Sequence, residues 1–405
     1  NLQPICNRIS FCLVCNFIFL SLFEFKMSLK MRIIILLFCV FILGCKQTSK
    51  SLEQGAQVKF IPLKEASFVE DLAPFVDTLL CIEPECPLPS PLSKMLVDRD
   101  GSMYMLGFGG QMLALTSEGK KYKNLVGHGR ANNEYVRVSD IALRQTPKEL
   151  LVLDEDKVLV VGLDDSVVVK NFRIPDNIPF DGIAPAAEGH YWLFSAFPGS
   201  EDNYLLRLID EEGRVLSKEL EGVDLAVSFM NITQSANNIY YLKPQSSEHI
   251  FYQLEQDSLI PRYEVDFGDK SIPERYYFDV TKNDMAQYMN APYFKQLSFA
   301  HETKNHFYFK CAGENAVEYN FLMNKRKPYG GIAWINRDKS SDIYVIGADD
   351  RFLYVVFNKH QAEVYNDSKE TNLLYRYIVQ TIDTGVVFKD SDEVIVKLSF
   401  KNIIQ

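Results

Sequence analysis

The chain has no excess of positive charge: among its 405 residues, 43 lysines and arginines stand against 53 aspartates and glutamates, a formal net charge of −10. A protein that holds nucleic acid by its phosphates needs a basic face, so no nucleic-acid partner is expected. Cysteine is also scarce, with 8 residues, whereas 47% of the chain is hydrophobic. This composition excludes a disulfide-dense miniprotein, a disordered tail and a collagen-like fibre, because there is ample apolar material for a large core.

Several enzyme motifs are missing as well. There is no Gly-x-Ser-x-Gly elbow for a serine hydrolase and no Gly-Lys-Ser/Thr step for a phosphate loop. No Cys-x-x-Cys pair is matched by a second one, so structural zinc is not expected. His301 and His306 are five residues apart, which does not fit the metalloprotease helix motif. We therefore expect no cofactor and no metal, and the sequence names no catalytic residue.

A short apolar run follows positive charge near the N-terminus. Ile33 to Leu43 is unbroken and comes after Lys30 and Arg32. Its eleven residues, at about 1.5 Å each, cannot cross a hydrocarbon layer of roughly 30 Å, so the run is typical of a signal peptide. The following Gly44-Cys45 resembles a bacterial lipobox, which implies that the sulfur of Cys45 carries a lipid.

These features divide the chain. We expect an upstream extension outside the natural product at residues 1–26, a lipoprotein signal peptide at 27–44, a tether at 45–56 and a folded body at 57–405. For the first stretch, a transmembrane helix from Ile5 to Phe25 is the alternative. In the body, Cys81 and Cys86 could close a small disulfide loop in an oxidising compartment, and two ordinary thiols are the other possibility.

The body repeats. Six times, two short runs rich in β-branched and aromatic residues are separated by a polar or glycine-containing turn, with a mean spacing of 48 residues between starts. The pairs are 102–106 with 111–116, 149–153 with 157–163, 190–194 with 204–209, 238–242 with 249–254, 306–310 with 316–322, and 342–347 with 352–357. A short apolar run precedes most pairs and a fourth run follows several. Four strands repeated six times predict a β-propeller.

The predicted fold class is therefore all-β: a six-bladed β-propeller with four-stranded antiparallel blades and a short helical insertion. The insertion is the aperiodic stretch 271–299, in which Asp279 to Met289 has helical spacing of apolar residues. Phe75 to Ile82 and Glu393 to Phe400 are both strand-like and stand at the two ends of the body. We expect them to meet where the ring closes.

The lipobox, the period and the loop Gly127 to Tyr135 together resemble the six-bladed β-propeller lipoproteins of Bacteroidetes, which are similar in form to NHL-repeat propellers. In that family the first blade ends in a loop of the form G-x-G-x-G-P-x-E-Y. Gly127, Gly129 and the pair Glu134-Tyr135 match it, whereas Ala131-Asn132-Asn133 replaces the Gly-Pro step. The resemblance implies a fold and an envelope address, and no activity.

The same loop is the candidate ligand site. Its glycines can bring backbone N–H groups close to a ligand, and its side chains can supply charge. The candidate residues are Gly127, His128, Gly129, Arg130, Glu134 and Tyr135. The alternative is a connector whose glycines satisfy positive φ and whose Glu-Tyr pair caps the next strand.

Two functions remain open, and enzymatic activity is the less expected. The first is a binding or scaffold module for a protein, peptide or glycan of the cell envelope, held to the membrane by its lipid at the periplasmic side of the outer membrane. The second is a propeller enzyme, a metal-assisted lyase or hydrolase working at the axial channel. Asp98, Asp140 and Glu188 lie near the inner-strand positions that such a channel would use.

Overall fold

The computed structural model describes most of the body. The described residues are 58–122, 125–174, 179–196, 204–221, 232–235, 239–242, 249–276, 285–314, 317–326, 330–336, 345–363, 372–383, 388 and 392–403. The predicted extension, signal peptide and tether, with Cys45, lie outside them. Within these ranges, every helix is too short or too polar to traverse a lipid bilayer.

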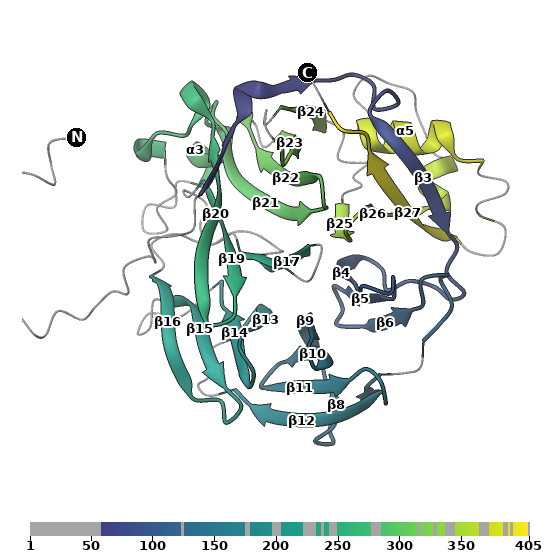
Figure 1. The fold of residues 1–405 in the computed structure, drawn as a ribbon, viewed down its shortest axis with the longest axis vertical. Coiled ribbons are helices and arrows are strands. Elements are labelled where there is room, and N and C mark those ends of the chain that lie inside the picture. Colours follow the sequence, from purple (N-terminus) through teal and green to yellow (C-terminus); the bar gives the residue numbers. More distant parts are fainter. Residues whose placement is uncertain are drawn as a thin grey trace, which may run out of the picture. The chain divides into compact units, whose positions relative to one another are not determined.

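Six sheets surround a common axis (Figure 1), which confirms the six-bladed β-propeller. The innermost strands are β4 (Leu92–Val97), β9 (Val138–Gln145), β13 (Gly182–Pro185), β17 (Ile232–Ser235), β21 (Lys295–Glu302) and β25 (Val345–Ala348). Blade one continues with β5 (Met103–Gly107) and β6 (Met112–Leu115), and blade two with β10 (Lys148–Asp154), β11 (Lys157–Gly162) and β12 (Val167–Arg173).

Blades three to five follow the same order from the axis outward. Blade three adds β14 (His190–Phe194), β15 (Tyr204–Asp210) and β16 (Val215–Glu221). Blade four adds β18 (Ile239–Leu242), β19 (Ile250–Glu255) and β20 (Ser258–Asp266), and blade five β22 (His306–Ala312), β23 (Glu318–Asn324) and β24 (Gly331–Asn336). Successive strands within these blades are antiparallel, as expected.

Because side chains alternate between the two faces of a strand, each blade packs against both of its neighbouring blades. In β22, Phe307 and Phe309 pack into a cluster with Tyr241 and Phe251 of blade four. The residue between them, Tyr308, packs into the cluster of blade six. Successive side chains of a strand point to opposite faces, so an unbroken aromatic run serves two interfaces. Burying each such ring stabilises the fold by about 2 kcal/mol.

Blade six closes the ring with strands from both ends of the body. Its order is β25, β26 (Leu353–Asn358), β27 (Glu393–Phe400) and β3 (Val76–Ile82), and β3 is antiparallel to β27. The predicted closure is therefore confirmed. The sixth sequence pair, however, corresponds to the first and second strands of its blade, because 342–347 overlaps the innermost strand β25 and 352–357 overlaps β26. This shift explains the short last spacing, since 47 residues separate the second strands that begin at His306 and Leu353.

Three blades modify the four-stranded unit. The segment before β3 adds β1 (Lys59–Pro62) to the outer edge of blade four and β2 (Ala66–Phe68) to that of blade five, each parallel to its neighbour. Figure 1 shows this segment in purple along the outside of the ring. Among the described residues, blade one has three strands. The sequence predicted neither the two added strands nor the missing one.

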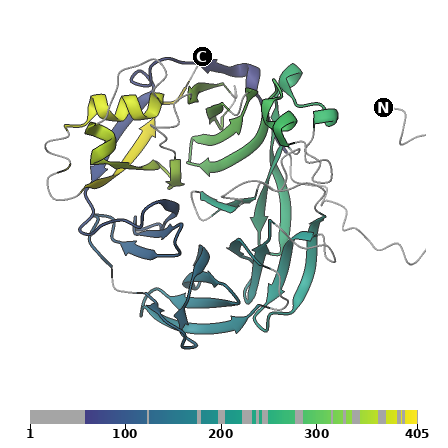
Figure 2. The ribbon, with the colours of Figure 1, turned by 180° about the vertical axis from the view of Figure 1, so that it is seen from behind.

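The helices lie outside the sheets. The expected short helix after blade four is α3 (Met285–Asn290), whose Tyr288 packs with Ile272 and Ala291, and residues 277–284 of the predicted segment lie outside the described ranges. Two unpredicted helices, α4 (Lys359–Glu363) and α5 (Leu373–Thr381), connect β26 to β27. Both ribbon views place α5 beside β3 and β27 (Figure 2). Single 3-10 turns occur at Leu63–Glu65, Gly268–Lys270 and Glu274–Tyr276.

The cysteines of the body are all free thiols. Cys81 and Cys86 are partly buried and Cys311 is buried, and none is bonded to another cysteine. Burial raises the pKa of the Cys81 thiol to about 11. Of the two possibilities left open for Cys81 and Cys86, the structure has the two separate thiols.

We expect acid to destabilise the packing of His306 against the segment that contains Lys401. His306 Nε2 donates to the carbonyl of Lys401 at 3.1 Å, and burial lowers the pKa of His306 to about 4. In the unfolded chain, the His306 ring takes up a proton near pH 6.5, whereas in the folded chain it does so only near pH 4. The contribution of the neutral ring to the free energy of unfolding is therefore complete above pH 6.5 and is lost as the pH falls toward 4. The full loss is about 3 kcal/mol. We expect His306→Gln to reduce the loss of unfolding free energy between pH 7 and pH 4.5, measured in urea. The exposed His360→Gln should leave the loss unchanged, and equal slopes for both variants would contradict the assignment.

Candidate functional site

Polar side chains of the innermost strands form hydrogen bonds between blades near the axis of the ring. Lys94 of β4 donates from Nζ to both carboxylate oxygens of Asp140 of β9, at 2.8 and 2.9 Å, and both residues are buried. Asp140 Oδ2 also accepts from the backbone N–H of Ile183 at 2.9 Å. Burial raises the pKa of Asp140, and the Lys94 ammonium acts against that rise. This carboxylate therefore joins three blades.

A second set of hydrogen bonds links Gln234 of blade four to blade one on the opposite side of the ring. Gln234 donates from Nε2 to the carbonyl of Val97 in blade one at 3.5 Å, and the main-chain carbonyl of Gln234 accepts from Nδ1 of His301 at 3.2 Å. His301 is 1% exposed, and burial lowers its pKa to about 4, so its ring is neutral at physiological pH. Gln234 and His301 therefore connect blades one, four and five near the axis.

The three carboxylates considered for an axial metal do not converge. Asp98 accepts from Nε2 of Gln145 at 2.6 Å and pairs with Nζ of Lys148 at 2.8 Å, whereas Asp140 is held by Lys94. Glu188 is exposed in the turn before β14. Within the described ranges, no three His, Cys, Asp or Glu side chains lie close enough together to hold a metal ion.

The predicted loop folds around one of its own carboxylates. β7 (Gly127–His128) and β8 (Glu134–Tyr135) form a short parallel pair, and the N–H of Gly129 donates to the carbonyl of Tyr135 at 2.9 Å. Glu134 Oε2 accepts from the N–H of Ala131 at 2.9 Å. Glu134 therefore organises the loop, and its carboxylate is already bonded on one side.

Gly129 lies close to the carboxylate of Glu134. A Cβ atom at Gly129 would lie 1.9 Å from Glu134 Oε2, so a larger residue there would displace this carboxylate from its place in the loop. Neither Gly127 nor Gly129 has a positive φ, so that part of the connector interpretation is wrong. The glycines bring the backbone close to a carboxylate of the same loop.

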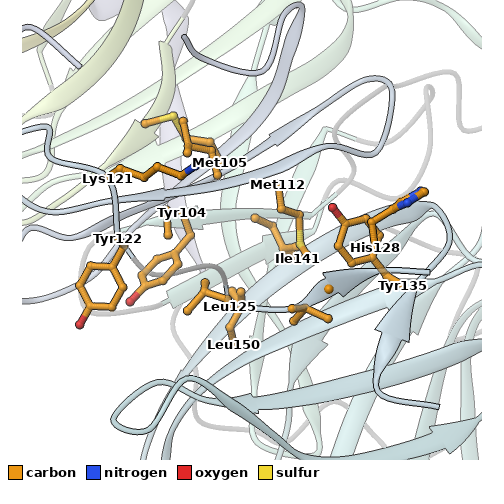
Figure 3. A pocket seen from close by; sticks show the side chains of 14 residues that line it. Tyr104, Met105, Met112, Lys121, Tyr122, Leu125, His128, Tyr135, Ile141 and Leu150 are labelled. Atoms are coloured by element: carbon orange, nitrogen blue, oxygen red, sulfur yellow. The ribbon is translucent and has the colours of Figure 1, made fainter. Parts of the chain in front are cut away.

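A cavity of about 270 Å³ opens beside this loop, between blades one and two. Its walls come from three parts of the chain: strands β5 and β6, residues 121, 122 and 125–128 with Tyr135, and Ile141 with Leu150 of blade two. Figure 3 shows Tyr104 with Tyr122 at one end and His128 with Tyr135 at the other, with four apolar side chains between them: Met112, Leu125, Ile141 and Leu150. We call this cavity the interblade pocket.

The structure brings half of the candidate residues to the pocket. Gly127, His128 and Tyr135 line it, whereas Gly129, Arg130 and Glu134 do not. The rings of His128 and Tyr135 meet edge to face, with centroids 5.5 Å apart. Arg130 is exposed at the tip of the loop.

The remaining walls were missed by sequence reasoning. Tyr104, Met112, Tyr122, Ile141 and Leu150 belong to strands or turns that look like ordinary core. One signal was available: after Thr116, no strand-like run follows before Val138, so blade one lacks the run that would have filled this space. A missing strand therefore marks the pocket in the sequence.

The pocket is suited to recognition of an apolar group with polar edges. Burial raises the pKa of Tyr104 and of Tyr135, so both hydroxyls stay protonated and can donate. Lys121 lies at the same opening and contributes positive charge. The described lining residues include no serine, cysteine or carboxylate side chain.

A second cavity lies at the ring closure and has about 710 Å³. It contains four carboxylates, from Glu85, Glu363, Asp392 and Glu393, beside Cys86 and His360. Glu393 Oε2 accepts from the N–H of Leu88 at 3.0 Å, and burial raises its pKa. None of the candidate residues lies there, and among the described residues no three of these His, Cys, Asp or Glu side chains are placed to hold a metal ion together.

Comparisons with known proteins agree with the fold. A family of 6-bladed beta-propeller proteins matches residues 110–339, more than half of the chain, so the chain belongs to this family. No curated protein sequence matches. The Bacteroidetes lipoprotein character and the NHL-like relationship expected from the sequence stay predictions.

Solved structures are similar to this one at low identity. A Bacteroides fragilis protein named as an exported protein has 13% identity and a TM-score of 0.61, over 85% of this chain and 100% of that one. AztD of Citrobacter koseri has 11% identity and a TM-score of 0.38, over 65% of this chain and 66% of that one. A PQQ-bound aldose sugar dehydrogenase of Streptomyces coelicolor has 9% identity and a TM-score of 0.38, over 80% and 98%. The first of these supports the fold.

Proposed function

We propose that this protein is a binding module that captures a partner protein or peptide through the interblade pocket. The observation that carries the proposal is the cavity of about 270 Å³ with an apolar floor and tyrosine and histidine edges, opening beside the loop Gly127 to Tyr135. An apolar floor favours a bulky apolar side chain over a sugar, whose hydroxyls would leave water without replacement bonds.

The nearby surface is suited to a protein partner. Phe108 is 49% exposed and Val136 is 41% exposed, in two loops that meet where Gly110 packs against the backbone of Val138. Exposed apolar side chains grouped beside a pocket are typical of an interaction site. They would extend the contact beyond the single group inside the pocket.

We further propose that the module works in the cell envelope, attached through a lipid at Cys45 to the outer membrane and facing the periplasm. Support comes from the lipobox-like Gly44-Cys45 after an apolar run and from a structural relative named as an exported protein. The partner would then be an envelope protein. Mass spectrometry of the native protein tests the anchor, since an unmodified sulfur at Cys45 would overturn it.

The pocket can be tested by filling it. Ala114 lines the cavity and is 7% exposed, so Ala114→Phe would occupy the space without altering the outer surface. Proteins retained from detergent-solubilised envelopes by the immobilised chain should fall at least about tenfold with this variant, measured by quantitative mass spectrometry, because a tenfold loss requires only about 1.4 kcal/mol.

The matched control places the same ring elsewhere. Leu216 is 47% exposed on β16 of blade three, so Leu216→Phe should retain the same proteins as the unmodified chain. Circular dichroism would verify that both variants are folded. Equal retention by Ala114→Phe and the unmodified chain would overturn the proposed function.

A further inference from the structure

The segment beside the interblade pocket is basic in an acidic chain. Residues 117–137 contain five lysines and arginines against two glutamates, a formal charge of +3, whereas the whole chain carries −10. The rest of the chain therefore carries −13. Such a local reversal of sign indicates the charge of a partner, because complementary charge steers association and like charge rejects wrong partners.

The cations of this segment lie at the pocket or close to it in the chain. Lys121 lines the pocket, and Arg130 and Arg137 each stand two residues from a lining residue. The Cγ atom of Arg137 is 3.2 Å from the position that a Cβ atom of Gly110 would take, so Arg137 also adjoins the turn between β5 and β6. All three cations are exposed, and none forms an ion pair with another described residue.

Three carboxylates of the same region are bonded to the backbone. Glu134 Oε2 accepts from an N–H of its own loop at 2.9 Å. Asp154 is 2% exposed, and its Oδ1 accepts from the N–H of Arg137 at 2.8 Å. Glu85 Oε2 accepts from the N–H of Lys121 at 2.9 Å. Backbone groups therefore hold these carboxylates, whereas the neighbouring cationic side chains face solvent and can meet a partner.

The size of the pocket restricts the kind of anionic partner. Its volume of about 270 Å³ lies below the range of about 300 to 1,000 Å³ that is typical of small-molecule sites, and its floor is apolar. A cavity of this size suits one bulky apolar side chain and is small for the acyl chains of a lipid. In a protein segment, the residues on either side of that anchor can bring carboxylates to the cations beside the pocket.

We propose that the partner of the interblade pocket is an acidic protein segment in which aspartates or glutamates flank one bulky apolar residue. The apolar side chain enters the pocket, and the flanking carboxylates lie against Lys121, Arg130 and Arg137. This inference rests on the proposed function, and it adds the charge of the partner and the residues that select it.

Reversing the charge of this surface tests the selection. With Lys121, Arg130 and Arg137 all replaced by Glu, the amount of envelope protein retained by the immobilised chain should fall about tenfold, because three attractive pairs become repulsive. Circular dichroism would verify that the variant is folded. The matched control makes the same change of net charge and should retain as much as the unmodified chain. It replaces three exposed lysines near blades four and five by Glu: Lys64, Lys270 and Lys304.

Two further measurements report the chemistry of the partner. Raising sodium chloride from about 0.05 M to about 0.5 M should release the retained proteins from the unmodified chain, since salt screens exposed charges. The photo-cross-linking residue p-benzoylphenylalanine, placed at the exposed Val136, should capture partner peptides in which acidic residues flank a bulky apolar one. Mass spectrometry identifies these peptides.

The outcomes separate this inference from the proposed function. If the charge-reversed variant retains as much as its control while Ala114→Phe loses the same proteins, or if the cross-linked peptides are neutral or basic, the acidic partner is overturned and the proposed function stands. If charge reversal abolishes binding to phosphatidylglycerol vesicles and leaves retention of proteins unchanged, the basic segment is a lipid site and the inference is also overturned. If neither Ala114→Phe nor charge reversal changes retention, both fall.

Discussion

A chain that begins at Pro84 will not form a stable ring. It lacks β3, which contributes a ladder of six residue pairs to β27, and it lacks Leu72 and Val76, which are 0% and 6% exposed in the core of blade six. With about 1 kcal/mol for each of several hydrogen bonds and about 2 kcal/mol for each buried side chain, the loss is on the order of 8 kcal/mol. A whole domain is typically stable by about 5 to 15 kcal/mol.

We expect this deletion variant to lose its cooperative thermal transition, followed by circular dichroism, and to aggregate through the exposed edge of β27. The matched control begins at Ala56, where the compact unit of residues 56–405 starts, and should melt like the full chain. A shared melting temperature for the two truncated chains would show that the closure at blade six is not needed for stability.

Replacing Lys94 by Met should have the largest effect of any single substitution at the axis. The side chains of Lys94 and Asp140 are 6% and 8% exposed, so the variant leaves a buried carboxylate with only the N–H of Ile183 as an inter-blade partner. Breaking a buried pair in this way costs about 3 to 5 kcal/mol, because the remaining charge has lost both water and its counter-ion. Urea unfolding at pH 8 measures the loss.

The pH dependence identifies the charge as the cause. Without Lys94, the pKa of Asp140 in the folded chain rises further. Between that pKa and about pH 4, Asp140 is protonated in the folded chain but ionised in the unfolded chain, so lowering the pH stabilises the folded variant. The deficit of the variant against the unmodified chain should therefore shrink between pH 8 and pH 5. The double variant Lys94→Met with Asp140→Asn should recover about 2 kcal/mol.

An exposed ion pair gives the control for this series. Arg214 pairs with Asp210 through Nε at 2.6 Å, but the Arg214 side chain is 73% exposed. Arg214→Met should leave the unfolding free energy nearly unchanged, because water and salt screen such pairs. If the difference in unfolding free energy between Lys94→Met and the unmodified chain were the same at pH 8 and pH 5, it would contradict the interpretation that the variant leaves the Asp140 carboxylate buried without its counter-ion.

Strand identity could be predicted because local chemistry sets it. Runs such as Tyr191 to Phe194 fit a pleated surface buried on both faces, and Gly119 and Gly213 adopt the positive φ that their turns require. The repeat therefore gave six blades and the partners of the ring closure. It did not give the position of each strand within blade six, because the run Ile343 to Ile346 has the β-branched and aromatic residues of a second strand, whereas the innermost strand β25 begins only at Val345.

Added strands and the pocket could not be predicted for a different reason. β1 and β2 are held by backbone pairing to β20 and β24, and such pairing leaves little trace in side chains. The pocket is assembled from side chains such as Tyr104, Tyr122 and Leu150, whose sequence context is that of any core residue. Only the loop Gly127 to Tyr135 stood out, and half of its candidate residues line the cavity.

The path of residues 59–82 around blades four, five and six constrains the order of assembly. β3 is synthesised before any blade exists, whereas its partner β27 follows the other strands of all six blades in the sequence. Phe60 can pair only once β20 has been made, Phe68 only once β24 has been made, and Leu80 only once β27 has been made. Ring closure is therefore a late step of folding, and until then the unpaired backbone of these first strands must be kept from pairing with other chains.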